Sequence, residues 1–166
     1  MSSTYTIEIA NEQSEFDIDE DQICGAITYT LEQEAVVAAD ISVALIDNEH
    51  IHELNRRYLS HDYATDVLSF LLEETVPETT RAEGEPRGAG KSIEGELIVS
   101  TEMAAQVAQE YRWSPQDELL LYIVHGLLHL CGYDDLSESE KRIMRQRERE
   151  VLSHWNLTPH YQDHDA

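Results

Sequence analysis

The spacing of apolar residues along the chain predicts four strands and five helices. Apolar and polar residues alternate over residues 4–10, in a run rich in β-branched side chains, as is typical of a strand with one buried face. Three further apolar runs of strand length occupy residues 41–46, 67–71 and 97–99. Apolar residues that recur at every third or fourth position predict helices over residues 19–39, 48–58, 101–111, 115–131 and 137–153.

Two of these helices carry start signals of their own. Either Asp47 or Asn48 can cap the second helix. The fourth begins with Ser114 at the cap and Pro115 at the first helical position, and Gly132 ends it. Because residues 119–130 are apolar nearly all round, we expect this helix to be buried.

The order of the elements predicts an α+β fold. Strands that alternate with helices and are then followed by helices alone suggest one domain over residues 1–156, with a mixed, mostly four-stranded sheet and about five helices. Residues 73–94 contain prolines and glycines among polar residues without periodicity, so we expect a long mobile loop there. We expect a disordered tail over residues 157–166.

Charge changes this picture by excluding one class of function. The chain has 34 acidic residues against 11 Lys and Arg, a formal net charge of -23, which argues against general charge-driven binding of nucleic acid. The acid excess fits either a surface adapted to high salt or a face that docks on a basic partner. With neither a secretory signal nor an apolar run long enough to cross a bilayer, we expect a cytoplasmic protein.

Two histidines in the buried helix carry the candidate chemistry. His125 and His129 are four residues apart, so both project from one helical face and can bind one metal ion. Gly132 can turn the chain back and return Asp135 to them as a third ligand, with Asp134 as the competing third ligand. Three protein ligands with an open fourth position are typical of a catalytic zinc-type site.

Other interpretations of these residues remain open. A histidine in an apolar helix is often a core residue, although burying two without partners costs several kcal/mol. Zinc peptidases of the HExxH type need a Glu after the first histidine, where this chain has Gly126. Cys131 faces away from the histidines, and we interpret it as core packing.

The segment from His125 to Asp134, HGLLHLCGYD, resembles the signature HGxLHLxGYDH of the YbeY family. Residues 54–58 and 65–70 resemble the family's LNxxYR and PTDVLSF, and residues 95–100 resemble GDIxIS. Glu118-Leu119, ahead of the histidines, also fits. The resemblance covers residues 43–152, and its ten-residue signature is specific enough that chance does not explain it.

The resemblance implies an α+β fold, a zinc-type ion held by three histidines, and action on single-stranded RNA during small-subunit rRNA 3′-end maturation and ribosome quality control. Four features depart from the family: Asp135 replaces the third histidine, Leu59 replaces an arginine, Ala64 replaces a proline, and the stretch over residues 73–94 is longer than the family needs. Carboxylate oxygens bind zinc readily, but leucine cannot clamp a phosphate. Arg56 or Arg57 is a candidate replacement, and Asp66 can orient a water molecule or cap a neighbouring element.

We therefore expect a metal-dependent endoribonuclease with one Zn²⁺, or another divalent transition metal, on His125, His129 and Asp135. A metal-activated water would attack the phosphodiester, with Asp66 and Arg57 as candidate catalytic residues. Its partners would be single-stranded rRNA and the small ribosomal subunit with its basic proteins. The alternatives are a non-catalytic ribosome-assembly factor with a structural metal, and a metal hydrolase of another substrate.

A stripe of arginines on the last helix fits either kind of function. Arg142, Arg145 and Arg149 recur at intervals of three and four residues. They can contact RNA phosphates or pair with the glutamates around them.

Overall fold

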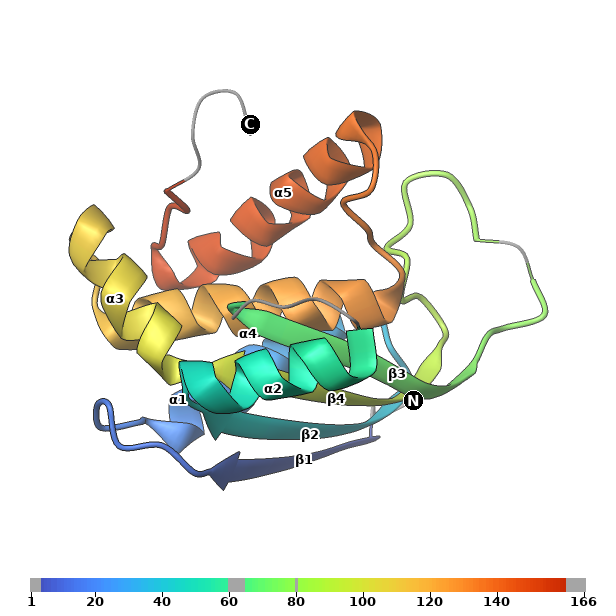
Figure 1. The fold of residues 1–166 in the computed structure, drawn as a ribbon. Helices are drawn as coiled ribbons and strands as arrows, with labels where there is room; N and C mark the ends of the chain where they lie inside the picture. The colour runs from blue at the N-terminus through green and yellow to red at the C-terminus, as the bar shows by residue number, and fades with distance from the viewer. Residues whose placement is uncertain (1–3, 60–64, 80, 161–166) are drawn as a thin grey trace.

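A four-stranded mixed sheet is the framework of the domain (Figure 1). The computed structural model describes residues 4–59, 65–79 and 81–160. The strands are β1 (Thr4–Asn11), β2 (Ala38–Ile46), β3 (Val67–Thr75) and β4 (Ser92–Ser100), in the order β1-β2-β4-β3. The β1–β2 and β2–β4 pairs are parallel, whereas β3 and β4 are antiparallel, so the predicted mixed sheet is confirmed.

Helices cover both faces of this sheet. They are α1 (Glu20–Gln33), α2 (Asn48–Leu59), α3 (Thr101–Tyr111), α4 (Pro115–Cys131) and α5 (Glu138–Leu152), followed by a 3-10 turn over Ser153–Trp155. Alternate strand residues point to opposite faces: Leu97 packs with α1 and α4, while Ile98 packs with α2. Helix α4 lies between the sheet and α5 (Figure 1). Within the described residues, none of the helices has the length and apolar character needed to span a membrane.

Side-chain caps explain where the helices begin. Ser114 accepts a hydrogen bond from the Asp117 amide and Ser137 from the Glu140 amide, as capping serines do. Asp47, rather than Asn48, accepts from the amide of His50 in the first turn of α2, over 2.9 Å. These caps satisfy amide groups that have no partner within the helix.

The predicted first helix, over residues 19–39, is too long. Helix α1 ends at Gln33, Ala35 takes a left-handed conformation with φ of 57°, and Ala38 already belongs to β2. Ala38 pairs with Thr4 on one side and Ser92 on the other. This strand pairing outweighs the helical periodicity of the alanines, because helix propensity is a weak preference that tertiary contacts override.

The predicted loop over residues 73–94 is wrong at both ends. Strand β3 continues to Thr75 through a bulge, and β4 begins at Ser92. The connection between them packs on the domain, because Gly88 lies over Glu34 and Val36. Residues 157–160, assigned to a disordered tail, also lie on the domain, and residues 161–166 lie outside the described part of the chain.

A buried carboxylate ties this connection to the helices. Glu34 has no exposed surface and accepts hydrogen bonds from the Gly88 amide, the Tyr133 hydroxyl and the Arg147 guanidinium. Burial and the charge of Glu34 raise the pKa of Tyr133 to about 12, so its hydroxyl remains a donor at neutral pH. The turn after α4, which contains Tyr133, is thereby fixed to α1 and α5.

Helix α4 approaches the sheet closely at Gly126, and adding a side chain at this position tests that close approach. A Cβ added there would lie 2.8 Å from Leu97 Cδ2 and 3.0 Å from Ser69 Oγ. We expect Gly126→Ala to lower the free energy of unfolding by about 1–2 kcal/mol, because overpacking outweighs the gain in helix propensity. Chemical denaturation measures this change.

Gly25, in α1, is the matched control because an added Cβ there meets no atom within 4 Å. We expect Gly25→Ala to raise the free energy of unfolding by about 0.5–1 kcal/mol. Equal stabilisation by both substitutions would contradict the close approach at Gly126.

Candidate metal centre

The last turns of α4 bring two imidazole rings together. Four residues apart on one helical face, His125 and His129 have their Nε2 atoms 3.1 Å apart. The helix ends at Gly132, whose φ of 113° is a left-handed conformation that glycine adopts without strain. The chain then turns back, so that Asp135 Oδ2 lies 3.9 Å from His125 Nε2 and 3.8 Å from His129 Nε2.

These three residues form a group with the dimensions of a metal site. Their ligand atoms lie within 4.8 Å of one another. In a tetrahedral zinc site with bonds of about 2.0–2.2 Å, neighbouring ligand atoms are roughly 3.3–3.6 Å apart. The observed separations bracket this value. Asp134, the competing ligand, instead accepts a hydrogen bond from the Leu136 amide over 3.1 Å.

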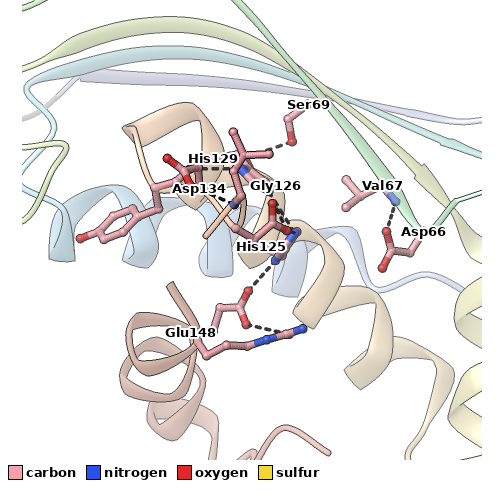
Figure 2. A network of polar contacts seen from close by, with 12 residues as sticks. Asp66, Val67, Ser69, His125, Gly126, His129, Asp134 and Glu148 are labelled. Carbon is pink, nitrogen blue, oxygen red and sulfur yellow. Dashed lines mark hydrogen bonds and ion pairs between the residues drawn. The ribbon is translucent and has the colours of Figure 1, made fainter. Parts of the chain in front are cut away.

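The far side of each ring is held by an acceptor. His125 Nδ1 lies 2.5 Å from Oε1 of Glu148, a residue of α5 with no exposed surface (Figure 2). His129 Nδ1 lies 3.1 Å from the Tyr133 carbonyl oxygen. A carbonyl or carboxylate oxygen only accepts, so each Nδ1 is the donor and each Nε2 offers a lone pair to the other ring. Two facing lone pairs require a cation between them, either a proton or a metal ion.

The two rings differ in their proton affinity. Burial alone would lower the pKa of His125, but the hydrogen bond and charge of Glu148, with Asp66 and Asp135, outweigh it and leave the pKa raised. Burial, together with the charge of His125, lowers the pKa of His129. The pair therefore holds one proton in preference to two, and a metal ion competes with that proton.

The group lies in a cleft of about 690 Å³ between β3, α3, α4 and α5. Asp66 lines this cleft and accepts a hydrogen bond from the Val67 amide over 2.7 Å (Figure 2). Ser69 donates to the Gly126 carbonyl oxygen and so joins β3 to α4. Among described residues, the charged side chains that line the cleft are Asp66, Glu110, Glu118, Asp135 and Arg145, besides the histidines.

The structure does not bring Arg57 to this group. Arg57 is on the exposed side of α2, where it pairs with Glu53 over 3.1 Å, and it is not part of the cleft lining. Leu59, at the family's arginine position, is also exposed. Ala64 lies outside the described residues. Cys131 is buried, as predicted, and burial raises the pKa of its thiol.

The sequence left two roles open for Arg145, contact with RNA phosphates or pairing with a glutamate. Arg145 lines the cleft, with Nη1 3.6 Å from Glu148 Oε2. The predicted stripe of arginines on α5 does not form one surface. Arg142 and Arg149 line a separate cavity, together with Arg81, Arg87 and Arg147. Helical spacing alone could not separate these two surfaces. Tyr111, Glu118 and His160, at another part of the cleft, were not recognised as site residues.

Comparisons with known proteins agree with this arrangement. The family model described as Endoribonuclease YbeY matches residues 8–156. Endoribonuclease YbeY of Pelotomaculum thermopropionicum is 43% identical over 122 residues, covering 72% of this chain and 74% of its own. That of Carboxydothermus hydrogenoformans is 39% identical over 149 residues, covering 88% and 94%.

A solved structure shows the same fold. The solution structure of TM1509 from Thermotoga maritima superposes with a TM-score of 0.51 at 23% sequence identity, covering 95% of this chain and 100% of that one. Because the family model and the relatives match most of the chain, this protein belongs to the YbeY family.

Proposed function

We propose that this chain is a metal-dependent endoribonuclease that cleaves single-stranded RNA in the cytoplasm, during small-subunit rRNA 3′-end maturation and ribosome quality control. The observation that carries the proposal is the group of His125, His129 and Asp135 in an open cleft. Its relatives bear the name Endoribonuclease YbeY. The small ribosomal subunit and its basic proteins are the proposed partners.

The donor set of two imidazoles and one carboxylate suits zinc. When bound there, a divalent ion such as Zn²⁺ supplies Lewis-acid chemistry: it polarises a phosphoryl oxygen and lowers the pKa of water. Glu148 and the Tyr133 carbonyl keep both Nε2 atoms directed at the shared position. Asp135 brings a negative charge where the family signature has a neutral histidine.

The charge of the cleft also favours a cation. Asp66, Glu110, Glu118 and Asp135 would together repel a phosphodiester. Arg145 offsets part of this charge and can hold a phosphate through a planar pair of N–H donors. The Asp66 carboxylate, directed into the cleft, can accept a proton from an attacking water molecule.

An assembly factor with a structural metal is the second candidate. The observation in its favour is Leu59, which is exposed where the family motif has an arginine. Structural zinc sites are usually closed by four protein ligands, whereas this group has three ligands among the described residues and opens to a cleft. The geometry therefore favours the enzyme.

The identity of the third ligand can be tested by metal analysis of untagged protein. We expect one equivalent of zinc in the unchanged chain, and a loss of affinity in His129→Ala and Asp135→Asn that exceeds the 10–100-fold typical of outer partners. Asp134→Asn is the matched control and should retain the metal. Retention by Asp135→Asn with loss in Asp134→Asn would assign the ligand to Asp134 instead.

Of Arg145 and Arg57, we expect only Arg145 to bind the phosphate of the substrate. We expect Arg145→Ala to lower kcat/KM for cleavage of single-stranded RNA about 100-fold, because a positively charged hydrogen-bond donor at the reacting phosphate is lost. Arg57→Ala, on the exposed side of α2, should leave kcat/KM unchanged. Equal zinc content in both variants would show that the metal group is intact. A larger loss in Arg57→Ala would refute this assignment.

A further inference from the structure

Tyr111 and Glu118, which line one part of the cleft, form an aromatic slot together with the neighbouring Trp113. The imidazole of His160 occupies it. This ring stacks on Tyr111, with centroids 3.8 Å apart and an angle of 9° between planes. The edge of Trp113 meets the same ring at 5.0 Å and 76°. A flat ring is therefore held by one aromatic face and one aromatic edge.

The carboxylate of Glu118 makes the slot polar at one side. Glu118 is only 1% exposed, and its Oε2 lies 2.6 Å from His160 Nε2. A carboxylate only accepts hydrogen bonds, and leaving a buried one without a donor is costly. Tyr122 also hydrogen-bonds to this carboxylate, and beside it the slot accommodates a planar ring that presents an N–H group to Glu118 Oε2.

We propose that this aromatic slot is a nucleobase subsite for the RNA substrate, and that His160 of the chain's own C-terminal segment fills it until RNA binds. The inference rests on the proposed function for its substrate class. Bases of single-stranded RNA stack on aromatic side chains and offer N–H groups at their edges, as the imidazole does here. Tyr111, Glu118 and His160 line the same cleft as the metal group. A base in the slot therefore belongs to the same RNA strand that reaches the metal group.

The acceptor in the slot selects among the bases. Guanine has two adjacent donors, N1–H and the 2-amino group, which match the two oxygens of a carboxylate. Adenine, cytosine and uracil each present fewer donors at the corresponding edge. The subsite therefore prefers guanine.

Nucleotide binding tests the proposal without RNA cleavage. Trp113 and Trp155 are the two tryptophans, so in a Trp155→Phe background the fluorescence of Trp113 alone reports on the slot. Titration with GMP, AMP, CMP and UMP holds the ribose and phosphate constant and compares the bases. In this background we expect His160→Ala to bind GMP at least about fivefold more tightly, because the competing ring is gone.

Three further variants in the His160→Ala background assign the contacts. Tyr111→Leu should weaken binding of all four nucleotides about tenfold, as loss of base stacking does. Glu118→Gln should reduce the preference for GMP over AMP. Tyr58→Leu is the matched control, because Tyr58 is 62% exposed on α2 and outside the cleft lining; it should change nothing.

The outcomes are decisive in both directions. If His160→Ala binds GMP no more tightly than its parent, or if Tyr111→Leu binds it as well as the control, the slot holds only the chain's own tail and the proposal is wrong. A chain that binds GMP in this way but cleaves no RNA would keep the subsite and refute the proposed nuclease. Metal-dependent cleavage without base binding would refute the subsite alone.

Discussion

The site depends on one buried charge, the carboxylate of Glu148. A carboxylate with no exposed surface must be paired, and His125 donates to it over 2.5 Å. This contact joins α5 to α4 and sets the orientation of the His125 ring. Because His125 donates its Nδ1 proton to Glu148, the lone pair of its Nε2 is directed toward His129 and Asp135. The same carboxylate also lies near Arg145, the cation of the cleft.

Two other contacts keep the remaining ligands in range. Gly126 lets α4 approach β3 and β4 closely, and the histidines line one cleft together with Asp66, the residue before β3. Tyr133, anchored by the buried Glu34, holds the turn that returns Asp135 and presents its carbonyl to His129. A buried carboxylate also holds the ring in the aromatic slot, because Glu118 is paired with a ring nitrogen of His160. In this acidic chain, buried carboxylates orient His125 and His160.

Local pattern predicted much of this arrangement. The spacing of His125 and His129, the glycine at the helix end and the offset of Asp135 are properties of a short segment, and they led to the group that the structure contains. Arg145 and Glu148 depend on how α5 lies against α4, which no local pattern encodes. The early end of α1 and the added length of β3 and β4 arise from pairing between distant strands. His160 meets Glu118 across 42 positions, so this contact also needed the fold.

We propose that RNA cleavage depends on one metal ion held by His125, His129 and Asp135, and that Glu148 orients His125 for it. This proposal is tested most directly by measuring cleavage of single-stranded RNA by metal-stripped protein against free zinc concentration. The account predicts no cleavage without metal, saturation at one equivalent, and a requirement for about 10–100-fold more free zinc in Glu148→Gln. Glu150→Gln, an exposed neighbour on α5, should behave as the unchanged chain. Full cleavage without metal, or the same zinc dependence in Glu148→Gln, would contradict it.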